Sequence, residues 1–194
     1  MSEPTIIVLG GINGAGMTTA SRQLLADTLR VMTFVNADVI AQGLSGFAPE
    51  SAAVEAGRIM IERVRSLAEQ RADFAFETTL AARAYAGWLD EVRHRGYAVH
   101  LIYFWLRSAN LAVSRVAARV QAGGHHVPET TVRRRYARSV KNLFELYAPV
   151  VTTWRVYDNT EFAPTLIAEG SRGTPETVHD TESWSLIRKV VEHG

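Results

Sequence analysis

Short runs of apolar residues, many of them β-branched or aromatic, recur along the chain and are bounded by turn residues. Most of these runs are apolar at successive positions. That pattern is typical of strands covered by helices on both faces, as in a parallel sheet. We therefore predict the strands of a mainly parallel sheet at residues 5–9, 32–35, 73–76, 98–105 and 154–157.

Segments with helical periodicity separate these runs. In one of them, Ile61, Val64 and Leu67 share an apolar face while charged residues occupy the opposite face, as in a helix that packs on a sheet. The predicted helices cover residues 18–29, 50–70, 82–95, 110–121, 129–146 and 184–191. Residues 170–183 are polar and rich in turn residues, which predicts a surface loop. The alternation of strands and helices predicts an α/β fold in a single domain, residues 1–194.

The composition excludes several classes of function. The formal net charge of +1 comes from 21 basic and 20 acidic residues, so no overall field attracts nucleic acid or an anionic membrane. The absence of cysteine excludes disulfides, thiol chemistry and cysteine-ligated zinc. No stretch has the pattern of a signal peptide or is long and apolar enough to span a bilayer. We therefore expect a cytoplasmic protein whose anion binding, if any, is local.

The clearest motif is the glycine-rich stretch GGINGAGMTT at residues 10–19, between the first strand and the first helix. It follows the phosphate-loop pattern G-x-x-x-x-G-K-[ST] at Gly11, Gly16 and Thr18, but Met17 stands where lysine is expected. Backbone N–H groups and a helix N-terminus at this point would bind phosphate, with the Thr18 hydroxyl on Mg²⁺. The predicted nucleotide-binding residues here are Gly11, Asn13, Gly14, Ala15, Gly16, Met17, Thr18 and Thr19. The alternatives are a tight turn only, and an ordinary first-turn threonine.

Two further strand ends carry carboxylates. Asp38 follows the second strand, and Glu77 and Thr78 end the third, so parallel pairing would bring all three to the carboxyl edge of the sheet where ligands bind. Asp38 is a candidate general base for a substrate hydroxyl, or else a helix N-cap. Glu77, with Thr78, is a candidate for substrate binding or for water-mediated Mg²⁺ binding, or else a carboxylate near a helix start.

A third group of candidates is basic. Arg115 and Arg119 share one helix face, and Arg133, Arg134 and Arg135 begin the next helix, after a Gly-Gly break. Residues 115–138 therefore resemble a lid that could close over a triphosphate and neutralise its charge. Three adjacent arginines point in different directions, so only some of them can face phosphate. His125 and His126 lack a partner at metal spacing and are interpreted as polar lid residues.

These residues carry a resemblance to a known family. The chain resembles zeta-toxin-like kinases, in particular the stand-alone zeta-like P-loop ATPases of bacteria. The resemblance runs from about residue 6 to residue 170 and rests on NADVIAQGLSGF, AGRIM, FAFETTL, RVAARVQAGGHHVPE, RRRYARS and VYDN. It implies a P-loop NTPase fold of kinase type in three layers, which uses ATP and Mg²⁺ to phosphorylate a hydroxyl. In zeta toxins that hydroxyl belongs to UDP-N-acetylglucosamine.

Carried over by motif, the resemblance makes Asp38 the base, Thr18 the metal ligand and Glu77 an acidic residue on the substrate side. It makes Arg119 with Arg133 or Arg134 the lid arginines. From these we predict Asp38, Arg119 and Arg134 as catalytic, and Arg115 and Arg133 as ATP-binding. It also raises a possible antitoxin protein as partner.

Two departures lie in the glycine loop. Ile12 stands where the family usually has proline, and Met17 stands where it has lysine. Methionine has a similar reach but no charge and no donors, so we expect a kinase that is impaired in this form. The alternative is a nucleotide-binding regulatory module or pseudokinase without transfer. A nucleic-acid-processing P-loop protein is disfavoured by the balanced charge.

Overall fold

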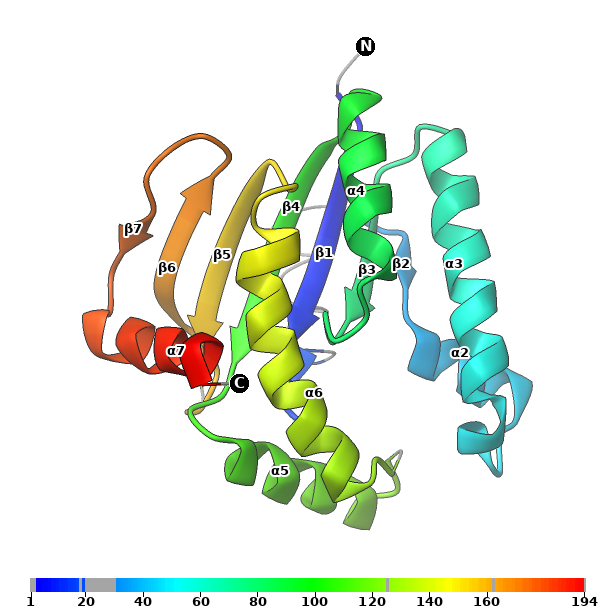
Figure 1. Ribbon diagram of the computed structural model, residues 1–194. Helices are drawn as coiled ribbons and strands as arrows, with labels where there is room; N and C mark the ends of the chain where they lie inside the picture. Colours follow the sequence, from blue (N-terminus) through cyan, green and yellow to red (C-terminus); the bar gives the residue numbers. More distant parts are fainter. Residues whose placement is uncertain (1–2, 18, 20–30, 125, 162, 194) are drawn as a thin grey trace.

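The computed structural model describes residues 3–17, 19, 31–124, 126–161 and 163–193. Strands of this part of the chain form one seven-stranded sheet in the order β2-β3-β1-β4-β5-β6-β7 (Figure 1). The parallel strands are β1 (Thr5–Gly11), β2 (Phe34–Val35), β3 (Phe74–Thr78), β4 (Ala98–Trp105) and β5 (Thr153–Asp158). The antiparallel strands β6 (Thr165–Ser171) and β7 (Thr177–Val178) extend one edge. The helix predicted at residues 18–29 lies almost wholly outside the described residues.

The described helices connect and cover these strands. They are α2 (Ala37–Leu44), α3 (Ala53–Glu69), α4 (Ala84–His94), α5 (Ala109–Gln121), α6 (Glu129–Asn142) and α7 (Thr181–His193), with a short 3-10 turn, η2 (Pro49–Ala52), and a π-helical turn, η3 (Leu143–Tyr147). In Figure 1, α4 and α6 cross the near face of the sheet, and α5 lies beyond the carboxyl ends of the parallel strands. No helix in the described part of the chain is long and apolar enough to cross a membrane.

Burial explains why the strand pattern was readable from the sequence. Ile6, Ile7, Val8 and Leu9 of β1 are each at most 2% exposed, so side chains on both faces of this strand are covered. The predicted α/β fold with a mainly parallel sheet is therefore confirmed. Within the range predicted to be a polar surface loop, the chain instead completes β6 and forms β7. The strand residues inside this range, 170–171 and 177–178, are part-exposed and mostly polar, so they lack the continuous apolar run of a covered strand.

Packing of α7 on the sheet is the basis of this antiparallel edge. The Trp184 ring of α7 stacks on Trp154 of β5 with centroids 5.9 Å apart. Trp184 also donates from its indole N–H to Glu176, and the Arg188 guanidinium lies over the Phe144 ring at 4.5 Å. Trp154 fits here because its neighbour on β6 is Gly170, where an added Cβ would lie 2.5 Å from the indole ring.

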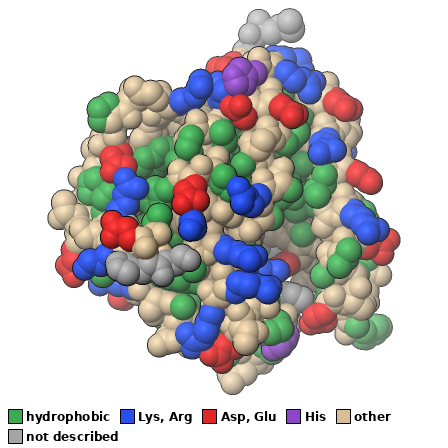
Figure 2. Space-filling model, viewed as in Figure 1, with side chains coloured by type: hydrophobic (Ala, Val, Ile, Leu, Met, Phe, Trp, Pro, Cys, Tyr) green, Lys and Arg blue, Asp and Glu red, His purple; other side chains and the backbone are tan. Residues whose placement is uncertain are grey.

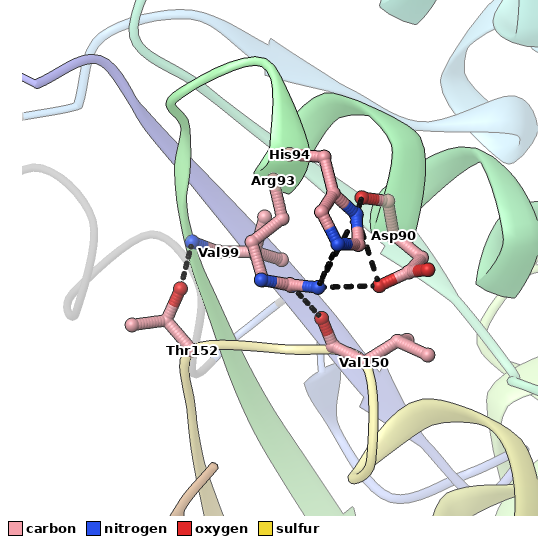
Figure 3. Close-up of polar contacts among 6 residues, drawn as sticks. All are labelled: Asp90, Arg93, His94, Val99, Val150 and Thr152. Carbon is pink, nitrogen blue, oxygen red and sulfur yellow. Dashed lines mark hydrogen bonds and ion pairs between the residues drawn. The ribbon is translucent and has the colours of Figure 1, made fainter.

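A polar network ties α4 to the segment before β5, at the amino ends of the strands (Figure 3). Arg93 donates from Nε to the Val150 carbonyl at 2.9 Å and forms an ion pair with Asp90 at 2.7 Å. Thr152 accepts a bond from the Val99 N–H at 3.0 Å. The hydrogen bond from Arg93 lowers the pKa of Asp90. This end of the sheet is closed by structural contacts, which leaves the opposite end for ligands.

Gly170→Ala is expected to lower the free energy of unfolding by about 1–3 kcal/mol, because the new methyl group collides with a stacked tryptophan that has no room to retreat. Without this collision alanine would be favoured over glycine in a strand, so a fall in the free energy of unfolding points to the collision. Gly87→Ala in α4, where no atom lies within 4 Å of the added Cβ, is the control and should stabilise by about 1 kcal/mol. Urea unfolding of both variants measures the difference. A Gly170→Ala protein as stable as the parent contradicts the packing argument.

Candidate active site

The glycine loop is closed by backbone hydrogen bonds at the end of β1. The Ile12 N–H donates to the Phe104 carbonyl of β4 at 3.1 Å, and the Ala15 N–H donates to the Ile12 carbonyl at 2.9 Å. Gly14 and Gly16 have φ values of 82° and 71°, in the left-handed region that glycine enters at little cost. The loop therefore has the backbone of a tight anion-binding turn that precedes a helix.

Side chains and close contacts shape the same loop. A Cβ on Gly11 would lie 2.7 Å from the Phe104 carbonyl and 2.8 Å from the Met17 sulfur, so only glycine fits. Asn159, just after β5, donates from its amide to the Ala15 carbonyl and closes the far side. The buried Oδ1 of Asn13 has no hydrogen-bond partner within the described part of the chain. Such an unsatisfied group is rare in a packed interior and is typical of a place where a ligand or water completes the bonding.

Met17 lies in the hydrophobic core rather than in the loop's polar face. It is 7% exposed, its sulfur contacts the Cα side of Gly11, and part of it borders the cavity described below. A thioether offers an anion no N–H donor and no charge. Any positive charge at this site has to come from elsewhere in the chain.

The carboxylates at the sheet edge are organised by a residue that the sequence analysis did not identify, Asn36. It is the N-cap of α2, where its Oδ1 accepts from the N–H groups of Asp38 at 2.7 Å and Val39 at 3.3 Å. Its Nδ2 donates to Glu77 Oε2 at 2.9 Å and so joins the ends of β2 and β3. The N-cap interpretation of Asp38 is therefore wrong, because Asn36 already fills that position. Asp38 is exposed in the first turn of α2.

The arginines of the predicted lid lie in different surroundings. Arg115 donates to the carbonyls of Asn159 at 2.7 Å and Thr160 at 2.5 Å, which fixes α5 to the segment after β5. Arg119 borders the cavity, and the Gly-Gly turn folds back on it because the Gly124 N–H donates to the Arg119 carbonyl at 2.9 Å.

Of the three adjacent arginines, Arg135 is the one among the described residues that borders the cavity. Arg133 is exposed and bonds Glu129 at 2.8 Å and Asn110 at 2.7 Å, and Arg134 is also exposed. The geometry therefore replaces Arg133 and Arg134 at the cavity with Arg135. The reason is helical periodicity: Arg135 shares a face with the buried residues Val132 and Ser139.

The surroundings of Arg135 change the pKa of its guanidinium group. Half-burial lowers the pKa of its guanidinium, the neighbouring Arg134 lowers it further, and the negative charge of Asp38 opposes both. Arginine nevertheless stays charged, since its pKa lies far above neutrality. Figure 2 shows Lys and Arg side chains gathered along the face of the molecule over α6, so the local field is positive although the net charge is small.

One cavity of about 560 Å³ brings these parts together. Ten of the predicted residues line it: Asn13, Gly14, Gly16, Met17, Thr19, Asp38, Glu77, Thr78, Arg115 and Arg119. The buried Ala15 and the closely packed Gly11 belong to the loop behind it, and Thr18 lies outside the described residues. Residues 3–17, 19, 31–124, 126–161 and 163–193 contain no group of three or more His, Cys, Asp or Glu side chains placed to hold a metal ion.

Part of the cavity lining is more apolar. This part consists of Ala53, Gly57, Met60 and Ala82, together with Tyr85, whose ring packs against Phe76 with centroids 5.1 Å apart. Burial raises the pKa of the Tyr85 hydroxyl, so it stays protonated at neutral pH and can donate a hydrogen bond. Tyr85 was not predicted. Its position in the first turn of the helix that follows the polar end of β3 was the available signal.

A parallel sheet with a glycine loop after its first strand, a carboxylate edge and two arginine-bearing helices defines a P-loop NTPase fold of kinase type. A family model described as an AAA domain, AAA_33, matches residues 6–141, and the chain belongs to this family. A relative, an uncharacterised protein of Haemophilus influenzae, is 29% identical over 126 residues, which cover 65% of this chain and 88% of the relative.

Solved structures share the fold at low sequence identity. One comes from the PezAT chromosomal toxin-antitoxin system of Streptococcus pneumoniae, with 14% identity, a TM-score of 0.65, and coverage of 99% of this chain and 87% of that one. Another is the AvrRxo1-ORF1:-ORF2 complex with ATP, with 15% identity and a TM-score of 0.73. The match covers 97% of this chain and 64% of that chain, so this chain spans less than two thirds of its length.

Asn36→Asp is expected to make stability depend on pH. The variant keeps the oxygen that caps α2 but replaces the N–H donor to Glu77 with a second carboxylate. Repulsion raises the folded-state pKa of the pair, so the folded state binds more protons and stability falls as pH rises from about 4 to 7. The loss at neutral pH should be about 1–3 kcal/mol.

Asn110→Asp is the matched control, because Asn110 Oδ1 accepts from Arg133 and a carboxylate there gains an opposite charge. Urea unfolding at a series of pH values compares both variants with the parent. If the difference in the free energy of unfolding between Asn36→Asp and the parent does not change with pH, the carboxylate at position 36 does not interact with Glu77.

Proposed function

We propose that the protein transfers the γ-phosphoryl group of ATP to a hydroxyl of a small molecule. The observation that carries this proposal is the single cavity in which the glycine loop, the carboxylate of Asp38 and the guanidinium groups of Arg119 and Arg135 come together. The ATP in the AvrRxo1-ORF1:-ORF2 structure supports nucleotide binding by this fold.

The glycine loop fits nucleotide phosphates. Its glycines permit the left-handed turns at Gly14 and Gly16, and the buried Asn13 amide lies in the same turn. The backbone N–H groups of Asn13, Gly14 and Gly16 would bind the β- and γ-phosphates, and Thr18 with Glu77 would hold Mg²⁺, which supplies charge neutralisation at the phosphates. Met17 weakens this part of the site because it contributes no donor.

Asp38 is the proposed general base. It accepts the proton of the substrate hydroxyl as that oxygen bonds to the γ-phosphorus and the bond from the phosphorus to the bridging oxygen of ADP breaks. Asp38 is exposed and borders the cavity, and Asn36 caps the helix in its place. The negative charge of Asp38 raises the pKa of the Arg135 guanidinium, so the two side chains lie near each other at the cavity.

Arg119 and Arg135 are the proposed cations on the transferring group. Arg115 has a supporting role, since its guanidinium donates to two backbone carbonyls and holds α5 beside the glycine loop. Negative charge increases on the phosphoryl oxygens during transfer, so fixed guanidinium groups act mainly on the rate. The proposed catalytic arginine of α6 is therefore Arg135 and not Arg134, which the sequence predicted.

The proposed acceptor is amphipathic. The rest of the cavity lining combines the polar Thr78 with apolar side chains that include Tyr85 and Met60. A nucleotide sugar such as UDP-N-acetylglucosamine, which the resemblance to zeta toxins suggests, has this character. The toxin-antitoxin source of the PezAT structure supports an antitoxin protein as a possible partner.

A second function is favoured by Met17 itself. Its burial in the core shows that the site accommodates an apolar residue where transfer needs a cation. In this alternative the protein binds nucleotide as a regulatory module and transfers nothing. The variant Met17→Lys distinguishes the two functions.

Asp38→Asn, made together with Met17→Lys, is expected to abolish transfer and leave ATP affinity within about twofold, because general-base assistance is worth about a hundredfold or more. Asp90→Asn, on the surface of α4 at the other end of the sheet, is the control. Calorimetry measures ATP binding, and mass spectrometry of a metabolite pool incubated with ATP and Mg²⁺ detects phosphorylated products. A transfer rate within about tenfold of the rate of the Met17→Lys protein contradicts the assignment of the base.

Met17→Lys is expected to tighten ATP binding by about ten- to a hundredfold, since a charge-assisted hydrogen bond to phosphate contributes about 1.5–3 kcal/mol. The increase in transfer rate should be larger, because the lysine also meets the charge of the transition state. Met32→Lys, at a position that is 84% exposed, adds the same charge outside the loop and is the control. Equal rates for the parent and Met17→Lys would mean that an arginine already replaces the lysine.

A further inference from the structure

Three side chains from one helical face hold the loop that follows β3. Ser139 of α6 donates to the Thr79 carbonyl at 2.5 Å, and Asn142 donates from Nδ2 to the Leu80 carbonyl at 2.7 Å. Tyr147 of η3 donates from its hydroxyl to the Ala82 carbonyl at 2.5 Å. Ser139, Asn142 and Tyr147 are 1%, 8% and 0% exposed, so all three donor side chains are buried. We call these three residues the loop clamp.

The π-helical turn makes the third of these bonds possible. In a regular α-helix the residues that share a face with Asn142 follow it by three or four positions, whereas Tyr147 follows it by five. The Ala148 N–H donates to the Leu143 carbonyl at 2.8 Å, a bond that spans five residues instead of four. This wider turn brings Tyr147 onto the face of Ser139 and Asn142. Such single π turns occur frequently at functional sites.

The clamped loop has a conformation that needs support. Leu80 has φ of 56°, which is uncommon for a residue with a branched side chain, and it is fully buried. Its side chain packs so closely on Gly10 that a Cβ there would lie 3.0 Å away. Backbone strain of this kind persists only where surrounding contacts hold it, and it is concentrated at ligand sites.

The same loop forms one wall of the cavity, and the clamp helix carries Arg135. Thr78, Thr79 and Ala82 line the cavity, and the loop leads directly to Tyr85. Arg135 lies one helical turn before Ser139, on the same face. Two further buried hydroxyls fix this helix: Tyr103 bonds Ser139 at 2.8 Å, and Tyr136 donates to the Leu106 carbonyl at 2.8 Å. The loop, the arginine and the end of β4 are therefore joined by buried bonds.

We propose that Ser139, Asn142 and Tyr147 are positioning residues that fix the acceptor half of the cavity and hold it in register with Arg135. Naming that half as the acceptor's rests on the proposed function, but the clamp itself does not. Loosening the clamp is predicted to weaken acceptor binding and to leave the glycine loop, and therefore ATP affinity, unchanged. This makes α6 a fixed wall of the site.

The first test needs no activity. Tyr147→Phe removes one hydroxyl from the clamp, and Tyr97→Phe removes one from a matched buried tyrosine, whose hydroxyl donates to the Ala68 and Ala72 carbonyls. Arg83 follows the clamped loop and is exposed, so trypsin cleavage after Arg83 reports opening of the loop. Mass spectrometry follows the appearance of fragments 1–83 and 84–194.

Tyr147→Phe is expected to speed cleavage after Arg83 about five- to tenfold, the factor of one buried hydrogen bond, while Tyr97→Phe leaves it unchanged. Asn142→Leu, which keeps the branch at Cγ and the number of heavy atoms but removes the donor, should have at least the effect of Tyr147→Phe. An unchanged rate in Tyr147→Phe, or an equal increase in Tyr97→Phe, overturns the clamp because the loop would then open only with the whole fold.

The second test separates positioning from general stability. In Met17→Lys protein, with Mg-ATP and UDP-N-acetylglucosamine as probes, Tyr147→Phe is expected to raise the acceptor KM about five- to tenfold and to leave the ATP Kd within about twofold. An equal loss of ATP affinity overturns the positioning role. If Met17→Lys protein with an intact clamp transfers no phosphate to this acceptor or to the metabolite pool, the proposed function fails, and the cleavage experiment still decides the clamp.

Discussion

The site depends on the parallel pairing of β1 with β3 on one side and β4 on the other. In this register Leu9 lies beside Glu77, Gly10 beside Thr78, and Gly11 beside Phe104. The first two pairs bring the acidic end of β3 level with the start of the glycine loop. The third provides the Phe104 carbonyl that accepts from Ile12 and turns the chain out of the sheet. A shift of this register would separate the loop from its carboxylates without changing either segment.

The electrostatics of the cavity are built from local groups because the chain as a whole is almost neutral. Backbone N–H groups offer partial positive charge at the glycine loop, and α5 and α6 bring Arg119 and Arg135 to the opposite wall. Asn36 gives the two carboxylates different surroundings. Its side chain donates a hydrogen bond to Glu77, and it caps α2 so that Asp38 is not needed as the cap. Because Met17 stands where the phosphate-loop pattern has lysine, the loop has no side-chain cation at this position. The positive side chains that line the cavity are therefore arginines of α5 and α6.

Continuous apolar runs allowed the parallel strands to be predicted from the sequence, because burial of both faces leaves an unambiguous pattern. The antiparallel edge was not predictable in this way, since β7 has only two residues and the buried residues of β6, Ile167 and Ala168, are flanked by part-exposed positions. Asp38 and Asn36 are two residues apart after the same strand, and either is a good cap, so only the geometry could decide between them. The register of the three arginines was readable in principle, because Val132 and Tyr136 define the buried face of α6.

The wide turn at η3 has a consequence for how the chain length of this region can vary. Removing one residue between Asn142 and Tyr147 would leave the tyrosine four positions after the asparagine, where a regular α-helix places it on the same face. Adding one residue to a regular helix, by contrast, rotates everything beyond it by about 100°, and the wide turn is what absorbs the extra residue here. This segment should therefore accept a single deletion more readily than a single insertion, so that its residue count, as much as its composition, determines whether the loop beyond β3 stays in place.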